Sequence, residues 1–346
     1  MTVYLNGLGT AVPPHILPQT LAEDTARRLL GPRYAQFERL APSFATSGVE
    51  TRYSVVPIDW FTHDKGWTER TAAYTEGATE LFIDAATAAL KDAGLCADQI
   101  DTVVTVSTTG IATPTLEARA FTRMGFRRDI QRVPVFGLGC AGGVSGLGIA
   151  QQLAAGCPGS KVLMVSVEAC SVSFRTDRMQ KADVIATVLF GDGAAAAVLS
   201  TEGQGPKLGV ARQILWPDTL DIMGWDVDEV GLGVIFDRSI PDFVTANLRE
   251  AALKALDLSG LGAANIARFV CHPGGAKVVT AIEQSLSLPP ESLRAERDVL
   301  RDFGNMSAPT VLFVLKQVLE NKQSGQMVLA ALGPGFTGAF LPLEAP

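Results

Sequence analysis

Histidine and cysteine are scarce in this sequence. The chain of 346 residues has three histidines and five cysteines. The cysteines are odd in number, widely spread and never spaced as Cys-x-x-Cys, so neither a disulfide framework nor a zinc site is expected. We therefore predict a protein of a reducing cytoplasm in which one or two thiols have special roles. The five cysteines are Cys96, Cys140, Cys157, Cys170 and Cys271.

Positive charge is also in short supply. Lys and Arg number 29 against 36 Asp and Glu, which gives a net charge of −7 and an isoelectric point near 5.1. We expect no nucleic-acid partner, because the chain lacks a basic excess. The lack of like-charge runs argues against a helix bound to a membrane surface. Residues 1–15 have no basic segment before an apolar one, so we expect no secretory signal.

Apolar residues are abundant, at 47% against 19% charged. That composition excludes a disordered chain and allows a large core, in two ordinary domains or one duplicated domain. One uncharged stretch, residues 133–150, is long enough to raise the question of a membrane span. Its many glycines and its Pro134 favour a buried strand over 133–138, a tight turn and a small-residue helix deep in the core.

Strand-like and helix-like segments alternate along the chain, which is typical of an α/β protein with buried, largely parallel strands. A polar joint at 201–209 separates an N-terminal half, 1–202, from a C-terminal half, 203–346. The halves share an order of elements but no visible sequence repeat. We expect strands near 2–13, 100–110, 133–138, 161–169, 191–200, 207–216 and 267–272, a pair of strands joined by a Gly-Pro-Gly turn at 325–343, and helices near 68–95, 116–126, 241–256 and 308–320.

Cys140 is the first candidate for chemistry, because it lies at a strand-to-helix turn among glycines. The N-terminus of a helix favours a thiolate, and glycines let a substrate approach the backbone. The alternative is a buried structural cysteine, which is the commoner fate of an isolated cysteine.

Two polar residues are candidate partners of Cys140. His272 ends a buried-strand pattern, where open α/β sheets bind their ligands. Asn305 precedes a helix that we expect to start near residue 308, and it offers a neutral donor. The alternatives are a core histidine bonded to backbone and an ordinary N-cap asparagine. Together the three side chains suit thioester chemistry.

Six motifs, in order along nearly the whole chain, resemble those of the type III polyketide synthases, the chalcone-synthase-like enzymes of the thiolase fold. The resemblance implies a five-layered αβαβα core built from two related halves, a homodimer and a Cys-His-Asn site. The motifs are GLGCAGGVSGL around Cys140, VLFGDGAAAAVL, GWDVDEVGLGVIFDRSIPDFV, CHPGGAKVV around His272, GNMSAPTVLFVL around Asn305, and GPGFTGAF.

The resemblance also implies roles for single residues. Cys140 would hold the acyl group, and His272 and Asn305 would bind the thioester carbonyl oxygen. Phe190 would be an aromatic gate between the substrate tunnel and the cavity. Three further residues would line the cavity, namely Thr109, Ser173 and Ser307.

Two positions depart from the plant members of the family. Val234, in GLGV, stands where they often have the phenylalanine of GLTF, which argues against a flat aromatic starter. Arg52, in ETRY, matches one basic residue of their KRRY segment, which contacts coenzyme A phosphates, but the flanking lysines are missing. The segment TRYSVVPIDW resembles the corresponding segment of bacterial members that take long-chain acyl starters.

We therefore expect a medium or long fatty acyl-CoA starter, extension with malonyl-CoA, and an alkylpyrone or alkylresorcinol product, without a metal or nucleotide redox cofactor. Three alternatives stay open. An initiating ketoacyl-carrier-protein synthase shares the three residues but usually reads His-Gln-Ala-Asn where this chain reads HPGG. A cysteine thioesterase needs an activated water, for which the sequence shows no carboxylate. An acyl-binding scaffold needs no intact Cys-His-Asn set.

Overall fold

The central strands are apolar on both faces, so helices must cover both. In β6 (Val162–Ala169) every residue is buried. Met164 packs into one core cluster, whereas Leu163 and Val165 pack into another on the opposite face, because successive strand side chains point to opposite sides. The structure, a computed structural model, describes residues 1–178 and 180–346.

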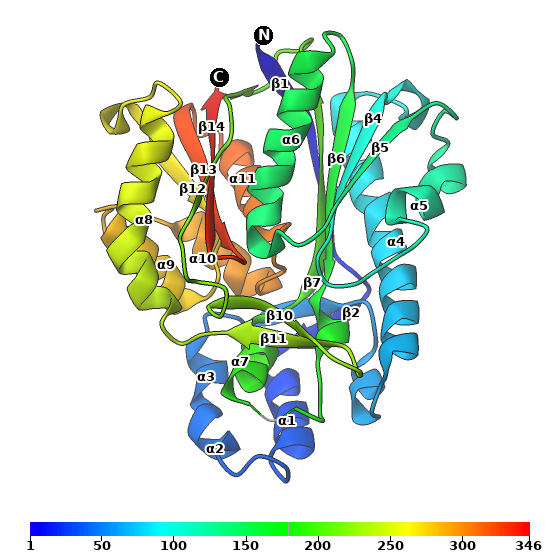
Figure 1. Cartoon of the computed structure of the whole chain (residues 1–346), viewed down its shortest axis with the longest axis vertical. Coiled ribbons are helices and arrows are strands. Elements are labelled where there is room, and N and C mark those ends of the chain that lie inside the picture. Colours follow the sequence, from blue (N-terminus) through cyan, green and yellow to red (C-terminus); the bar gives the residue numbers. More distant parts are fainter. Residues whose placement is uncertain (179) are drawn as a thin grey trace.

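Helices and strands form five layers, which Figure 1 shows from left to right. This is the αβαβα arrangement of two related halves that the sequence predicted. The layers are α8 (Ile240–Asp257) with α9 (Ala276–Ser285); β12 (Arg268–Cys271), β13 (Gly325–Gly333) and β14 (Thr337–Ala345); α6 (Gly142–Gly156) with α11 (Thr310–Glu320); β1 (Val3–Ala11), β7 (Asp192–Ser200), β6, β4 (Thr102–Val106) and β5 (Gln131–Val135); and α4 (Trp67–Ala93) with α5 (Leu116–Met124).

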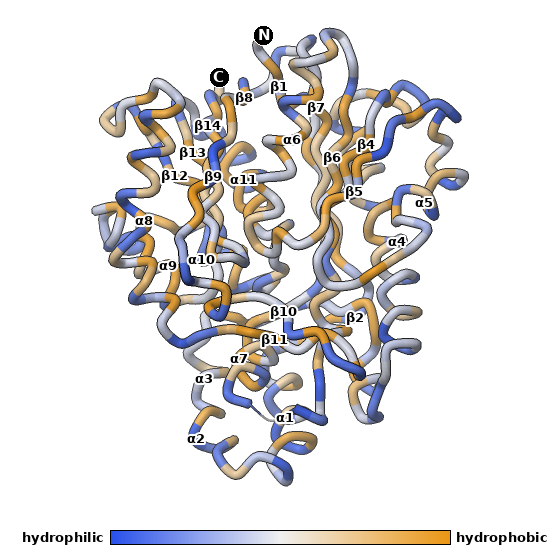
Figure 2. The backbone as a smooth tube through the Cα atoms, viewed as in Figure 1, coloured by the Kyte–Doolittle hydropathy of each residue, from blue (hydrophilic) through white to orange (hydrophobic). Residues whose placement is uncertain are grey.

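The middle layer is the reason for the glycine-rich stretch at 133–150. Helix α6 is buried along most of its length and packs against strands of both halves. Gly143 shows why small residues are needed, since a Cβ there would lie 2.2 Å from the main-chain oxygen of Ala308. Figure 2 shows the same contrast over the whole chain, with mainly hydrophobic inner strands and outer helices that alternate in hydropathy.

The expectation of largely parallel strands is wrong, because the sheet is mixed. The strand order is β12-β13-β14-β8-β1-β7-β6-β4-β5, with β8 (Lys207–Leu208) as the short link between the halves. Only β12–β13, β4–β6 and β4–β5 pair in parallel within the described residues. The closing strands β7 and β14 run antiparallel to their neighbours. Strand β14 follows β13 after a short turn at 334–336, a connection that parallel pairing does not allow.

The expectation of a buried strand at 133–138 is also wrong. Strand β5 is the last strand of the sheet and is mostly exposed, and Phe136 just after it is 58% exposed. A strand at the edge has a neighbour on one side only, so an apolar sequence there does not ensure burial.

Several of the remaining elements gather at one end of the sheets, in the lower part of Figure 1. Helices α1 and α7 pack on a small separate core, and the hairpin β10–β11 crosses in front of it. The elements not yet given are β2 (His15–Pro18), β3 (Thr51–Ser54), β9 (Arg212–Leu215), which pairs with β14, β10 (Met223–Val227), β11 (Leu232–Phe236), α1 (Gln19–Leu30), α2 (Phe37–Leu40), α3 (Pro42–Thr46), α7 (Lys181–Leu189), α10 (Arg294–Phe303), and the 3-10 helices η1 (Ile58–Thr62), η2 (Ala97–Gln99), η3 (Gly139–Ala141), η4 (Cys170–Ser173) and η5 (Ala263–Asn265).

Among residues 1–178 and 180–346, no helix combines the length and the apolar character needed to cross a membrane.

Candidate active site

Cys140 lies in the 3-10 turn η3, directly before α6. Its side chain is buried, and its Sγ donates to Ser307 Oγ at 3.4 Å. The turn is held from behind, because the main-chain N–H of Gly139 donates to Thr108 Oγ1 at 3.1 Å. The nucleophile candidate is therefore fixed at the point where a buried helix begins.

The buried thiol of Cys140 is protonated. Burial raises its pKa to about 12, and the hydrogen bond with Ser307 only partly opposes the rise. The sequence predicted that the helix start would favour the thiolate, but removal from water outweighs the partial charge of the helix N-terminus. Cys140 therefore needs a base to take its proton before it can attack a thioester.

His272 is a neutral imidazole in the same region. It follows β12, and its main-chain N–H donates to Ala330 O at 2.8 Å, which continues the pairing with β13. The side chain is buried, and burial lowers its pKa to about 4. Neither ring nitrogen has a hydrogen-bond partner in the described part of the chain. A neutral ring with both nitrogens free can accept a proton on one and donate from the other.

Asn305 is almost fully buried, and its orientation is fixed by two hydrogen bonds. Its Nδ2 donates to Gly274 O at 3.3 Å, and its Oδ1 accepts from the main-chain N–H of Ser307 at 2.8 Å. Because the carbonyl oxygen is occupied by Ser307, the amide presents its NH₂ group as a donor. The helix expected near residue 308 begins at Thr310.

One pocket brings these three residues together, and we call it the Cys140 pocket. Its wall is otherwise mostly apolar, which lowers the local dielectric and strengthens polar interactions inside. No hydrogen bond joins Cys140 to His272 or Asn305 within residues 1–178 and 180–346. Such contacts are often loose before substrate binds. The pocket is lined by Cys140, Met223, Phe236, Ile240, Leu248, Cys271, His272, Gly274, Val278, Ile282, Asn305 and residues 330–332.

A second pocket, which we call the inner pocket, continues from Cys140. It contains four of the predicted cavity residues, Thr109, Phe190, Val234 and Ser307. Phe190 stands edge-on to Phe236, with ring centroids 6.1 Å apart, and Phe236 also lines the Cys140 pocket. Phe190 therefore lies at a boundary between pockets, and its role as a gate stays a prediction. The other lining residues are Thr108, Gly139, Cys140, Cys170, Met223, Gly224, Trp225, Ile235, Phe236 and Pro334.

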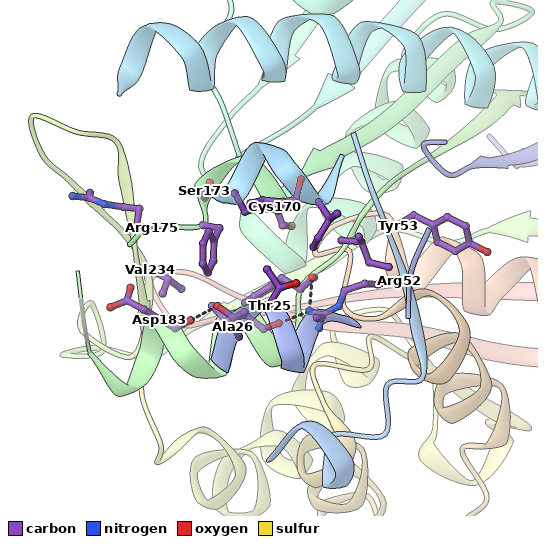
Figure 3. Close-up of a pocket in the computed structure, with 18 of the residues that line it drawn as sticks. Thr25, Ala26, Arg52, Tyr53, Cys170, Ser173, Arg175, Asp183 and Val234 are labelled. Atoms are coloured by element: carbon purple, nitrogen blue, oxygen red, sulfur yellow. Dashed lines mark hydrogen bonds between the residues drawn. The ribbon is translucent and has the colours of Figure 1, made fainter. Parts of the chain in front are cut away.

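A third pocket, the apolar pocket, extends the inner pocket between α1, α7 and η4. Ser173 lies here and not beside Cys140. Figure 3 shows Cys170 and Ser173 on the side of the pocket that faces Thr25 and Ala26 of α1. Four residues line both the inner and the apolar pocket, so the two are joined there: Cys170, Phe190, Trp225 and Val234.

Arg52 does not lie where a coenzyme A phosphate contact was expected. It is 3% exposed, and its Nη1 donates to Thr187 O at 2.5 Å and to Phe190 O at 3.0 Å (Figure 3). Its Nη2 donates to Gln19 Oε1 at 2.5 Å. The guanidinium is therefore used inside the fold. We therefore assign it no phosphate contact. The sequence motif alone could not show that the side chain of Arg52 is buried.

Exposed cations are found instead at an entrance pocket on the surface. Lys181, Arg238 and Lys277 are exposed at its rim, where Asp237 is the opposing charge among the described lining residues. The entrance pocket shares Phe236, Ile240, Gly274 and Val278 with the Cys140 pocket, so it leads directly to the nucleophile.

Sequence reasoning missed Glu168 and Trp225. Glu168 is fully buried in β6 and accepts hydrogen bonds from the main-chain N–H of Thr108 and of Thr109 and from Thr109 Oγ1. Burial raises the pKa of Glu168 to about 7. The sequence feature that could have identified Glu168 is a single acidic residue inside the apolar segment KVLMVSVEA. Trp225 donates from Nε1 to Thr108 O at 3.0 Å.

Glu168 bears on the thioesterase alternative, for which the sequence showed no carboxylate placed to activate a water. It is close enough to Cys140 for its charge to raise the pKa of the thiol. Its oxygens are nevertheless taken up by the three donors from Thr108 and Thr109, which hold the turn that faces Cys140.

The buried neutral state of His272 predicts acid sensitivity. Its pKa is lowered from 6.5 to about 4, so between these pH values the unfolded chain binds more protons than the folded one. The free energy of unfolding should therefore fall as the pH drops through this window, by about 3 kcal/mol for a shift of this size. In His272→Gln, urea unfolding at pH 7 and pH 4 should show a smaller loss than in the parent.

Exposed His63 provides the control for that measurement. His63→Gln should keep the full loss of stability between pH 7 and pH 4. An equal loss in the parent and in His272→Gln would show that the imidazole of His272 is not buried in its neutral form.

Comparisons with known proteins agree with this geometry. Residues 2–203 match the model of the chalcone and stilbene synthase N-terminal domain, and residues 207–342 match that of the C-terminal domain. The chain is 38% identical to 1,3,6,8-tetrahydroxynaphthalene synthase of Streptomyces peucetius, over 97% of this chain and 91% of the relative.

Solved structures of the same kind superpose along the whole chain. The crystal structure of 1,3,6,8-tetrahydroxynaphthalene synthase from Streptomyces coelicolor, a bacterial type III polyketide synthase, has a TM-score of 0.93 at 27% identity and covers 99% of both chains. CsyB complexed with CoA-SH has a TM-score of 0.92 at 27% identity, with 99% of this chain and 100% of that chain covered. The chain therefore belongs to the chalcone and stilbene synthase family and is a type III polyketide synthase with a thiolase-like fold.

Proposed function

We propose that this enzyme loads a fatty acyl-CoA on Cys140 and extends it with malonyl-CoA. The coenzyme A arm enters through the entrance pocket, whose exposed Lys181, Arg238 and Lys277 suit its phosphates. Because that pocket opens onto Cys140, an arm lying in it presents its thioester to the thiol. The complex of CsyB with CoA-SH supports a coenzyme A site in this fold.

Loading begins with proton transfer. Neutral His272 takes the proton of the Cys140 thiol, whose raised pKa makes a base necessary. The thiolate attacks the acyl carbonyl, the C–S bond to coenzyme A breaks, and the leaving thiolate takes the proton back from His272. The acyl group is then a thioester on Cys140.

Extension follows by decarboxylation. Malonyl-CoA loses CO₂, and the electron pair of the broken C–C bond forms an enolate whose oxygen carries the negative charge. The amide of Asn305 and a ring N–H of His272 donate to that oxygen, and the amide is already oriented by its bonds to Gly274 and Ser307 before the charge develops. The enolate carbon attacks the Cys140 thioester and releases the thiolate. None of these steps needs a metal or redox cofactor.

The apolar pocket is the observation that carries the choice of starter. It is reached from Cys140 through the inner pocket, and its wall includes Leu17, Ala22, Ala26, Ile58 and Phe61. An alkyl chain fits such a wall better than a polar polyketide does. We infer a medium or long fatty acyl-CoA starter and an alkylpyrone or alkylresorcinol product.

A second candidate is a malonyl starter, which the names of the tetrahydroxynaphthalene synthase relatives favour. Mass spectrometry of products from malonyl-CoA with acetyl- to palmitoyl-CoA, coumaroyl-CoA or no other starter separates the two. A larger yield of one aromatic product from malonyl-CoA alone, or a preference for coumaroyl-CoA, would overturn the fatty acyl assignment.

Catalytic efficiency should rise with the length of the starter. Each methylene buried in the apolar pocket contributes about 0.8 kcal/mol, or about fourfold in kcat/KM, until the pocket is full. Val234 lines the passage between the inner and the apolar pocket. Val234→Phe should therefore shift the optimum to shorter starters and leave loading by acetyl-CoA unchanged, as measured by steady-state kinetics across the series.

Val227 is a matched control for this substitution. It lies on the same hairpin but is 64% exposed. Val227→Phe should keep the chain-length profile of the parent. The same profile in Val234→Phe as in the parent would place the acyl chain elsewhere.

We propose that two copies form a homodimer through the edge strand β5. Phe136 and Ile111 are 58% and 54% exposed there, beside a pocket that they line with Pro134, Val135 and Leu116. A second copy pairs an exposed edge and covers its apolar side chains together. We also propose that the chain divides into two halves between residues 202 and 203, and that the enzyme acts in the cytoplasm.

The oligomeric state tests this surface. Analytical ultracentrifugation should give twice the chain mass of 36.5 kDa, and Phe136→Asp should shift it toward that of one chain. Leu220→Asp, at an exposed site on another loop, should remain dimeric. A dimer that Phe136→Asp leaves intact would exclude this edge as the interface.

A further inference from the structure

Arg52 and Gln19 form a buried polar cluster that the reaction steps do not use. Arg52 donates to the main-chain oxygens of Thr187 and Phe190 and to Gln19 Oε1. Gln19, 8% exposed, donates from Nε2 to Val188 O at 3.0 Å and to Ser47 Oγ at 3.1 Å. The two side chains thus bind three main-chain oxygens within residues 187–191, the segment that contains Phe190.

That segment is joined directly to Asn305. The main-chain N–H of Asn305 donates to Leu189 O at 2.9 Å, and the N–H of Gly191 donates to Asn305 O at 3.0 Å. Phe190 and Asn305 form an isolated parallel bridge. The backbone position of Asn305 is therefore set by the 187–191 segment, which the cluster holds from its other side.

The stem of Arg52 also fixes the packing of both segments. A Cβ at Gly191 would lie 3.0 Å from the Cβ of Arg52, and one at Gly304 would lie 3.3 Å from it. Gly304 has a φ of +69°, in the region that favours glycine. The residues that neighbour Phe190 and Asn305 thus rest on the same arginine stem.

We propose that Arg52 and Gln19 are positioning residues for the amide of Asn305. By binding the oxygens of Thr187, Val188 and Phe190, they hold the segment against which Asn305 is paired, and so aim its NH₂ group at the enolate oxygen. This inference rests on the proposed donor role of Asn305. It predicts that the cluster affects decarboxylation of malonyl-CoA and not loading of Cys140.

The charge of Arg52 is balanced within the same region. Burial lowers the pKa of Arg52 to about 10, and the charge of Asp192, which is fully buried two residues beyond Phe190, opposes that shift. The Oδ2 of Asp192 accepts from the main-chain N–H of Val55 at 2.8 Å, and its Oδ1 accepts from that of Ser171 at 2.7 Å. An arginine at position 52 therefore has a counter-charge inside the fold and needs none from a ligand.

Two variants test the inference. Arg52→Lys keeps the charge but cannot bind all three acceptors in one plane. Gln19→Met has a similar size and removes the donors to Val188 and Ser47. Because a displacement of about 1 Å can cost on the order of 10²-fold in rate, each should lower CO₂ release from malonyl-CoA at least about tenfold. Acylation of Cys140 by acetyl-CoA, followed by intact mass, should stay near that of the parent.

Arg70→Lys is the matched control. Arg70 is also buried and donates to three main-chain oxygens, those of Lys65, Val172 and Phe174, but no hydrogen bond in the described part of the chain joins it to the 187–191 segment. It should lower the melting temperature without a selective loss of decarboxylation. An equal fall of loading and decarboxylation in Arg52→Lys or Gln19→Met would overturn the inference, and Gln19→Met decides the matter if Arg52→Lys does not fold.

A double variant separates this inference from the proposed function. In Asn305→Ala, adding Arg52→Lys should cause no further loss of decarboxylation, because the positioned donor is already gone. A full additional loss would show that Arg52 acts by another route. If Asn305→Ala alone leaves decarboxylation intact, the donor role of Asn305 fails first, and the positioning role fails with it.

Discussion

Cys140→Ala should abolish product formation, and intact-mass analysis after incubation with an acyl-CoA should show no acyl adduct. Cys140 is the thiol placed where the Cys140 pocket and the inner pocket meet, within reach of a thioester that enters from the surface. A methyl group cannot form the thioester on which every later step depends. The loss should be complete, whereas removal of one stabilising donor leaves residual rate.

Two other buried thiols make this a sharp test. Cys170 lines the inner and apolar pockets, and Cys271 lines the Cys140 pocket. Burial raises the pKa of both well above the ordinary value, so neither ionises readily. Exposed Cys157 serves as a control, since Cys157→Ala should load normally. An acyl adduct that persists in Cys140→Ala would assign the nucleophile to Cys170 or Cys271.

The sequence predicted most elements of the fold because local signals agree there with the final packing. Helix α4 carries a long helical period and ends where Gly94 adopts φ +66°, as the glycine indicated. Strand β6 is an apolar run that is buried on both faces. At such places periodicity, turn residues and burial all favour one structure.

Strand order was beyond local reasoning. An apolar run such as 133–138 is consistent with either a central or an edge strand, and only the pairing of β5 with β4 alone makes it an edge. The antiparallel directions of β7 and β14 likewise depend on how each half closes, which no short segment encodes. Exposure of Phe136 follows from that topology.

The candidate site was predictable in part, because polar residues stand out in apolar motifs. Cys140, His272 and Asn305 lie more than thirty residues apart from one another in sequence, yet they line one pocket. Their protonation was not predictable, since burial outweighs the helix start at Cys140. Arg52 was assigned to a phosphate because its motif is basic, although burial directs its donors inward.

Four connected pockets lead from the surface past Cys140 to the apolar pocket. Phe236 lines the entrance, Cys140 and inner pockets, so one side chain borders the whole path from the surface to the cavity. Phe190 packs against Phe236 and lines both the inner and the apolar pocket. A growing chain on Cys140 can therefore place its alkyl end in the apolar pocket while the next malonyl-CoA enters from the opposite side.

Asn305→Ala should separate the two halves of the reaction. Its amide NH₂ is a donor to the enolate oxygen of malonyl-CoA, so its removal should lower CO₂ release by about 10²–10³-fold. Loading of Cys140 relies on His272 as the base and should survive. Rates of CO₂ release and of adduct formation, measured on the same preparation, give the comparison.

Asn305→Asp sharpens this prediction, because a carboxylate keeps an acceptor for the main-chain N–H of Ser307, which Asn305 Oδ1 now binds at 2.8 Å. It removes the NH₂ donor, including its bond to Gly274 O, and places negative charge beside the developing enolate, so decarboxylation should fall at least as far as in Asn305→Ala, while the bond from Ser307 is kept. Exposed Asn265 provides a control, since Asn265→Asp should leave both rates unchanged. If loading and decarboxylation fall together in both Asn305 variants, the residue serves to hold the loop beside Cys140 and is not a donor to the enolate.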